Sequence, residues 1–193
     1  MPIPVGRLLR NWKDDDMMTA LHVAAERNHL TLAQFLVSKS PELVNDHKNK
    51  TGCTPLVLAG SRGHLEICKF LLTVKKVDVN LVNIDSTSAL HYLVRYSPTT
   101  SEHIRTLSEI YKLLMKKHAE LDGENFRGET PVHQATRYLI LKILFLNCIL
   151  IRSLRVGNEG AIGVLAKSGA NINKQNKYDF FFSPQFQFFF SPR

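Results

Sequence analysis

A seven-residue motif recurs four times along this chain and constrains its fold more than any other feature. The first copy is TALHVAA at 19–25, and later copies begin at Thr54, Ser88 and Thr130, at spacings of 35, 34 and 42 residues. A unit of this length cannot bury its apolar face alone, so neighbouring units must stack on one another. The sequence therefore predicts an elongated array of stacked units.

The residue types within the motif predict a short helix with a defined start. A Thr or Ser at the first position can cap free backbone N–H groups with its hydroxyl. Pro55 and Pro131 come next, where a missing N–H costs little and the fixed φ suits the first helical turn. Leu21, Ala24 and Ala25 then form an apolar face at i, i+3 and i+4.

A second helical element follows the motif in the first two units. The second unit reads TPLVLAGSRGHLEICKFLL and then VDVN, with Gly63 where the first unit has Asn28. Both residue types suit the left-handed backbone that ends a helix. This succession resembles the ankyrin repeat, whose pattern is TPLHxAAxxGHxxVVxLLL followed by GAxxN. The resemblance covers about residues 18–179 and implies an all-α repeat solenoid of helix–loop–helix units joined by short β-hairpin fingers.

The same motifs set the expected organisation of the chain. Residues 1–17 are interpreted as an N-terminal cap or tail, and residues 18–179 as the repeat domain. The expected repeats are 18–52, 53–86, 87–128 and 129–179, the last with an apolar insert at 138–155. The Phe-rich residues 180–193 are expected to be a disordered tail or an artefact of gene annotation.

The third repeat is longer than the others. The polar, turn-rich run SPTTSEHIRT lies between Tyr96 and Leu107, and an apolar helical pattern resumes at 110–115. Insertions in repeat proteins fall in loops, often on a working face. We expect a loop here, either merely tolerated or used in binding.

Residues 138–156 interrupt the fourth repeat and allow three interpretations. As a transmembrane helix the run is nearly long enough, but Lys142, Asn147 and Arg152 would be costly in a bilayer. It could instead be a helical insertion with a working apolar face. The third interpretation is a retained intron, because its commonest residue types have AT-only codons and deleting 138–155 restores the repeat spacing. The sequence favours the intron.

No set of residues predicts catalysis, a cofactor or a metal site. The chain lacks the GxxxxGK[ST], GxGxxG, HExxH and GxSxG patterns, and its three cysteines show no CxxC spacing. His22, His91 and His133 occupy one motif slot, a repeat apart, which predicts hydrogen-bonded structural histidines rather than zinc ligands. The acidic run at 14–16 is interpreted as a solvated cap.

Composition limits the partners and the compartment. The net charge of +8 is scattered along the chain, so no nucleic acid is expected. Free cysteines and the lack of a secretory signal favour a cytoplasmic protein, with the nucleus as the alternative.

The resemblance implies a non-catalytic scaffold or adaptor that holds another protein on a concave face. The alternatives are a truncated N-terminal regulatory region of a larger signalling enzyme, such as a kinase or GTPase regulator, and a protein attached to membranes through residues 138–156. Finger positions that vary between repeats are the expected contacts. They are His47, Lys48, Asn49, Asn83, Ile84, Asp85, Glu124, Asn125, Phe126 and Arg127.

Overall fold

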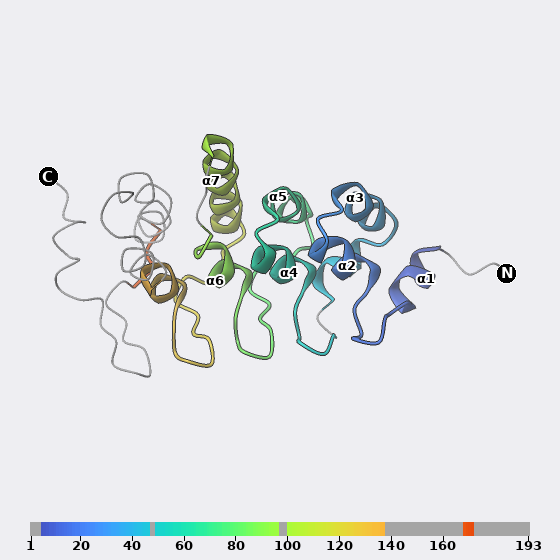
Figure 1. Cartoon of the computed structure of the whole chain (residues 1–193), viewed down its shortest axis with the longest axis horizontal. Coiled ribbons are helices and arrows are strands. Elements are labelled where there is room, and N and C mark those ends of the chain that lie inside the picture. Colours follow the sequence, from blue (N-terminus) through green and yellow to red (C-terminus); the bar gives the residue numbers. More distant parts are fainter. Residues whose placement is uncertain (1–4, 47–48, 97–99, 138–167, 172–193) are drawn as a thin grey trace, which may run out of the picture.

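The repeats form a single row of paired helices. The computed structural model describes residues 5–46, 49–96, 100–137 and 168–171. In these residues each repeat contributes an inner helix and then an outer helix, and the two kinds form two layers along the stack (Figure 1). The inner helices are α2 (Ala20–Glu26), α4 (Pro55–Arg62) and α6 (Ala89–Leu93), and the outer helices are α3 (Leu30–Lys39), α5 (Leu65–Thr73) and α7 (Ser101–Lys116). The predicted all-α repeat solenoid is confirmed.

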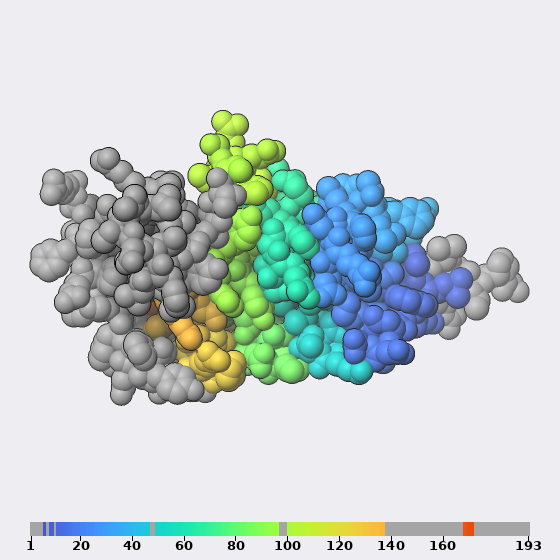
Figure 2. All heavy atoms as spheres, viewed as in Figure 1, coloured from blue at the N-terminus to red at the C-terminus, as the bar shows by residue number. Residues whose placement is uncertain are grey.

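Three further segments complete the described fold. Helix α1 (Val5–Asn11) lies at the N-terminal end of the row, within the segment expected to be a cap or tail (Figure 1). A 3₁₀ helix, Pro41–Asn45, follows α3. Residues 131–137 are helical and stand where the inner helix of a fourth repeat is expected. In the space-filling view the repeats succeed one another as bands of colour from blue to orange (Figure 2).

The core runs along the boundary between the two helix layers. The recurring apolar positions of the two helices predict nine buried residues: Leu21, Ala24, Leu56, Ala59, Phe70, Leu71, Leu90, Leu113 and Leu114. All of these except Phe70 and Leu113 are 0–1% exposed. The prediction was wrong for Phe70 and Leu113, which are only partly buried. Both hold the same position of an outer helix, at the edge of the core.

The residues predicted to end the inner helices adopt the left-handed conformation. Gly63 has φ +74° and Asn28 has φ +60°. A Cβ at Gly63 would lie 2.7 Å from the ring of Tyr96, so any other residue there would also require that ring to move.

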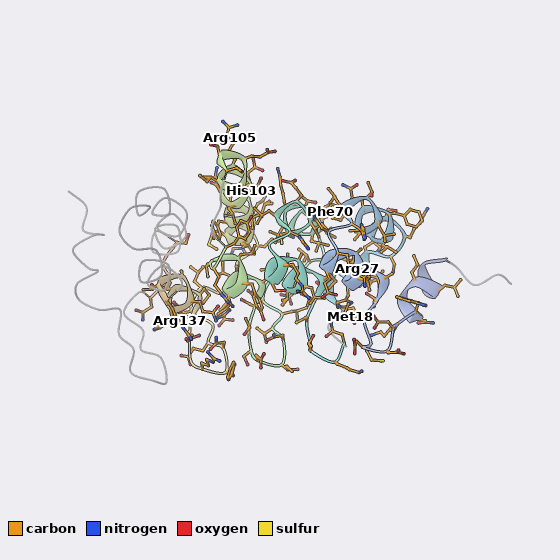
Figure 3. All side chains as sticks on the ribbon, in the orientation of Figure 1. Met18, Arg27, Phe70, His103, Arg105 and Arg137 are labelled. Atoms are coloured by element: carbon orange, nitrogen blue, oxygen red, sulfur yellow. The ribbon has the colours of Figure 1, made fainter. Side chains whose placement is uncertain are left out.

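The expected loop of the third repeat is mostly a helix, which corrects the sequence interpretation. Helix α7 starts at Ser101 and has 16 residues, against 10 in α3 and 9 in α5. The Thr100 hydroxyl caps it by accepting the N–H of His103 at 3.2 Å. The inserted residues therefore lengthen α7, whose N-terminal part, with Arg105, projects beyond the other outer helices (Figures 1 and 3).

Residues 168–171 return to the stack beside the third repeat. The Asn171 N–H donates to Asp122 Oδ1 at 2.8 Å, and Ala170 is buried. The Glu120 N–H donates to Asn80 Oδ1 at 2.8 Å in the same way, one repeat earlier. The segment expected as an insert, 138–155, and the tail, 180–193, lie outside the described residues.

The fingers that join successive repeats are short hairpins whose two arms are joined by a backbone hydrogen bond. The N–H groups of Asp14, Asn83 and Asn125 donate to the carbonyl oxygens four residues later at 3.1–3.2 Å. In the described part of the chain the arms form one isolated antiparallel bridge, between Val82 and Ser88, and no sheet. None of the helices that the structure describes is long and apolar enough to cross a bilayer, and the candidate run at 138–156 falls outside them.

Candidate functional site

The fingers share one local design, an Asp or Asn whose side chain closes the turn. Its Oδ1 accepts the backbone N–H four residues later at 2.8–3.0 Å in every finger. These turn-closing residues are Asp14, Asn49, Asn83 and Asn125. Three residues on, the backbone has a φ of 55–71°, at Met17, Gly52, Ser86 and Gly128. An Asx side chain that bonds its own backbone in this way fixes the turn.

This design corrects two sequence interpretations. Asp14 is not part of a solvated cap, because it closes a first finger that begins before residue 18. Asn49, Asn83 and Asn125 are 4–8% exposed and bonded to the backbone, so their side chains are not available as partner contacts. Every turn-closing residue lies five positions before the Thr or Ser of the motif, and this spacing could have revealed the role.

Backbone hydrogen bonds tie each finger to the next. The Lys50 N–H donates to Asp16 O at 3.1 Å, and the Ile84 N–H donates to Thr51 O at 3.1 Å. The Phe126 N–H continues the series by donating to Asp85 O at 2.9 Å. The fingers therefore hold a fixed spacing, and equivalent side chains of neighbouring fingers stand next to each other.

Two large apolar side chains occupy equivalent, neighbouring tip positions. Ile84 is 72% exposed and Phe126 is 53% exposed. We call these two residues the tip pair. The guanidinium of Arg127 lies 5.1 Å from the centre of the Phe126 ring, within the range of a cation–π contact. An exposed aromatic beside an arginine is the composition typical of interface hot spots.

The other predicted contacts fall into two groups. Asp85, Glu124 and Arg127 are exposed on the same two fingers as the tip pair. His47 and Lys48 lie outside the described residues. That any of them contacts a partner stays a prediction.

Buried histidines link the inner helices to the following fingers. His22 Nδ1 accepts the N–H of Thr19 at 3.1 Å, and Nε2 lies 2.9 Å from the carbonyl oxygen of Cys53. Because Nδ1 accepts, Nε2 carries the proton and donates to that carbonyl. Burial lowers the pKa of His22 below its usual 6.5, which keeps the ring neutral. We call this arrangement the histidine clasp.

The clasp recurs in the third repeat and is missing from the second. His91 Nδ1 accepts the Ser88 N–H at 3.2 Å, and Nε2 faces Glu129 O at 3.2 Å. Burial lowers the pKa of His91 as well. In the second repeat the position is Val57, which cannot hydrogen-bond through its side chain, and the Thr54 hydroxyl accepts the Val57 N–H.

His22 and His91 therefore hold the following fingers in place, and both nitrogens of each ring are hydrogen-bonded to backbone atoms. His133 Nδ1 lies 2.8 Å from the Thr130 hydroxyl, in the same slot. Among the described residues, no group of three or more His, Cys, Asp or Glu side chains is placed to hold a metal ion.

Comparisons with known proteins agree with this geometry. The family model for ankyrin repeats matches residues 5–83 and 39–110, which together are more than half of the chain. The chain belongs to the ankyrin-repeat family, and such an array implies a protein-interaction module.

Two relatives are much longer proteins. A probable serine/threonine-protein kinase of Dictyostelium discoideum is 30% identical over an alignment that covers 67% of this chain and 16% of the relative. Rabankyrin-5 of Mus musculus is 26% identical, over 68% of this chain and 11% of the relative. The chain thus spans a small part of either relative.

Proposed function

We propose that this chain is a non-catalytic scaffold that holds a partner protein on the fingers that end its second and third repeats. The observation that carries the proposal is the tip pair, Ile84 and Phe126, which exposes two large apolar side chains on fingers held in register by a backbone hydrogen bond. A soluble surface rarely places such side chains together without a use for them. Ordered fingers also lose little conformational entropy when a partner binds.

The charged residues beside the tip pair fit the rim of such an interface. Asp85, Glu124 and Arg127 lie on the same two fingers, within two residues of Ile84 or Phe126 in the sequence, and are exposed. A rim of this kind contributes mainly to specificity and to the rate of encounter, whereas the apolar centre contributes most of the affinity.

The test compares two sets of variants in quantitative affinity capture with the full chain. Replacing both tip residues, as Ile84→Ala with Phe126→Ala, should remove specific partners, and Phe126→Ala alone should weaken binding by about 1 kcal/mol or more. The matched control is Ile104→Ala, an apolar side chain 41% exposed on α7, away from the fingers. Equal capture by the tip variants, the control and the parent chain would reject the proposal.

A second candidate function is a regulatory region of a larger signalling enzyme. It is favoured by the kinase relative, of which this chain covers only 16%. Reading the transcript beyond codon 193 tests it, because a continuing kinase frame would support it and a stop codon would reject it. We place either form in the cytoplasm or nucleus, since Cys53 and Cys68 are buried free thiols that suit a reducing compartment.

A further inference from the structure

An arginine lies at the C-terminal end of the inner helix in each of the four repeats. It stands seven or eight residues after the Thr or Ser that begins the motif, and it is exposed in each case. These residues are Arg27, Arg62, Arg95 and Arg137, and we call them the arginine row. Because the inner helices pack side by side, the row follows the stack from Arg27 to Arg137 (Figures 1 and 3).

The helix dipole accounts for a cation at this place but not for its type. The dipole favours any positive side chain near a helix C-terminus. The outer helices α3 and α7 have lysines there, Lys39 and Lys116, whereas the inner helices have arginine. Arginine differs from lysine in its planar guanidinium, which can donate two parallel hydrogen bonds to one carboxylate. The composition of the row therefore favours the recognition of carboxylates.

Two members of the row already bind carboxylates of the chain itself. Arg62 forms an ion pair with Glu26 at the end of the preceding inner helix. Arg137 Nη1 lies 2.7 Å from Glu129 Oε1. In the part of the chain that the structure describes, Arg27 forms no ion pair. Since a guanidinium has five N–H donors, the row retains donors for further carboxylates.

The charge around the row is one-sided. The described inner helices, each taken with the turn that follows it, contain four arginines, no lysine and one acidic residue, Glu26. Glu129, which pairs with Arg137, precedes its helix and is buried. A ligand rich in carboxylates is therefore attracted to this surface with little opposing repulsion.

Apolar side chains accompany the arginines on the inner helices. Val23, Leu58 and Tyr92 stand three or four residues before Arg27, Arg62 and Arg95, and all three are half-buried. This spacing places both side chains on one side of a helix. Each of these helices thus presents an apolar contact beside a guanidinium.

The spacing of the row defines the shape of the ligand that fits it. Packed helices lie about 8–10 Å apart, so equivalent side chains of successive repeats recur at about that distance. A polyproline II segment advances about 9.3 Å in each turn of three residues and places every third side chain on one side. A β-strand turns successive side chains to opposite faces, so residues i and i+3 would point apart. The polyproline II conformation therefore matches the row.

We propose that the arginine row binds an extended acidic segment of a partner protein, in the polyproline II conformation and with Asp or Glu at every third position. Its carboxylates pair with successive guanidinium groups, and the residues between them pack on Val23, Leu58 and Tyr92. Such a segment loses little conformational entropy on binding, because its extended form is already populated. The row lies on the inner helices and does not include the tip pair, so this proposal and the scaffold proposal can fail separately.

The probe is a fluorescently labelled peptide of about five Glu-Pro-Pro triplets, because proline holds the polyproline II conformation. One control peptide has the same composition with its glutamates gathered at one end, and another has Gln in place of Glu. Fluorescence anisotropy with the full chain should show saturable binding of the triplet peptide, which weakens as salt is added. The gathered peptide should bind at least about threefold more weakly, and the Gln peptide should not bind.

Variants of the chain test the row. Arg27→Gln and Arg95→Gln should each weaken binding of the triplet peptide about threefold, and together about tenfold, as expected for exposed ion pairs. Glu26→Gln should tighten it by about threefold, because it removes the carboxylate that competes for Arg62. The matched control is Arg105→Gln, an exposed arginine on α7 far from the row, which should bind as the parent does (Figure 3). Circular dichroism checks that the variants keep their helices.

Several results would overturn the proposal. They are a failure of the triplet peptide to bind, equal binding of the gathered peptide, and equal weakening by Arg105→Gln and by the double variant of the row. Replacing the tip pair, as Ile84→Ala with Phe126→Ala, should leave the affinity for the triplet peptide unchanged. Loss of binding in that variant would place the peptide on the fingers and would also overturn the proposal.

Discussion

The two junctions on either side of the second repeat are held together in different ways. At the first junction, between repeats one and two, two histidines form hydrogen bonds from one repeat to the other: the His22 clasp reaches Cys53 O, and His64 Nε2 lies 2.9 Å from Glu26 O. At the second junction, between repeats two and three, Val57 replaces the clasp histidine.

The second junction has the more extensive contact between outer helices. The long helix α7 packs along α5 more extensively than α5 packs on α3, and its Ile110 is fully buried. Lys117 Nζ also donates to Val74 O at 2.9 Å, which satisfies a carbonyl at the C-terminal end of α5.

The difference shows that one repeat fold can be stacked by either layer. A junction needs enough buried apolar area or enough satisfied buried polar groups, and the layer that supplies them can change from one junction to the next. At the second junction the extensive contact between α5 and α7 accompanies the loss of the clasp at position 57.

The largest effect should come from an apolar truncation at the second junction. Ile110→Ala should lower the free energy of unfolding by about 2–5 kcal/mol, because it opens a cavity at a fully buried site. Leu32→Ala removes a leucine that is 43% exposed on α3 and should cost less than about 1 kcal/mol. Urea denaturation of both variants measures this, and equal losses would show that Ile110 stabilises the second junction no more than an exposed leucine stabilises the chain.

Removing the histidine clasp of the first junction should lower the free energy of unfolding somewhat less than Ile110→Ala does. His22→Ala leaves the Thr19 N–H and the Cys53 carbonyl buried without this partner, which should cost about 1–3 kcal/mol in unfolding free energy. His29→Ala is the control, since His29 is exposed and should change stability by about 0.5 kcal/mol at most. If both variants lost the same stability, the clasp would contribute nothing.

The clasps should also make stability depend on pH. Burial lowers the pKa of His22 and of His91 in the folded chain, so the unfolded chain binds more protons as the pH falls below about 6.5. The contribution of the two neutral histidines to the free energy of unfolding is therefore fully present above that pH. It is lost below that pH, by up to about 1.4 kcal/mol per pH unit for each histidine. Denaturation curves between about pH 7.5 and pH 5.5 test this, because they span one unit either side of that value. The double variant His22→Ala, His91→Ala should show a shallower slope, and an unchanged slope would contradict the assignment.

The smallest effect should come from restoring the missing clasp. Val57→His should change stability at neutral pH by about 1 kcal/mol or less, because a new hydrogen bond to Thr87 O offsets the loss of valine packing. Its signature is a steeper loss of stability below about pH 6.5 than in the parent chain. A variant with the parent's pH dependence would show that position 57 cannot form the clasp.

Much of the fold could be predicted from the sequence because the same order of capping, apolar and helix-ending residues recurs in successive repeats. The left-handed residues Asn28 and Gly63 could be predicted from their place after the inner helix. The long α7 could not, because its first residues are polar and turn-like in composition. Yet Ile104, Leu107 and Ile110 continue the helical spacing, and Thr100 supplies the cap.

The candidate site was predicted only in part. Variation between repeats predicted that the fingers are the binding surface. It could not distinguish the buried side chains that close a finger turn from the side chains that are exposed on the finger. Asn83 and Ile84 are adjacent in sequence, and one is 8% exposed and the other 72%. The distinction depends on the Asx turn, whose pattern becomes visible once the fingers are aligned on their turn-closing residues.

The most direct test of the interaction module is site-specific photocrosslinking in cells. A photoreactive phenylalanine analogue replaces Ile84 in one form of the full chain and Ile104 in another, since both side chains are exposed and apolar. Our account predicts a discrete protein adduct from position 84 after irradiation and none from position 104. Adducts from position 104 alone, or none from position 84, would contradict it.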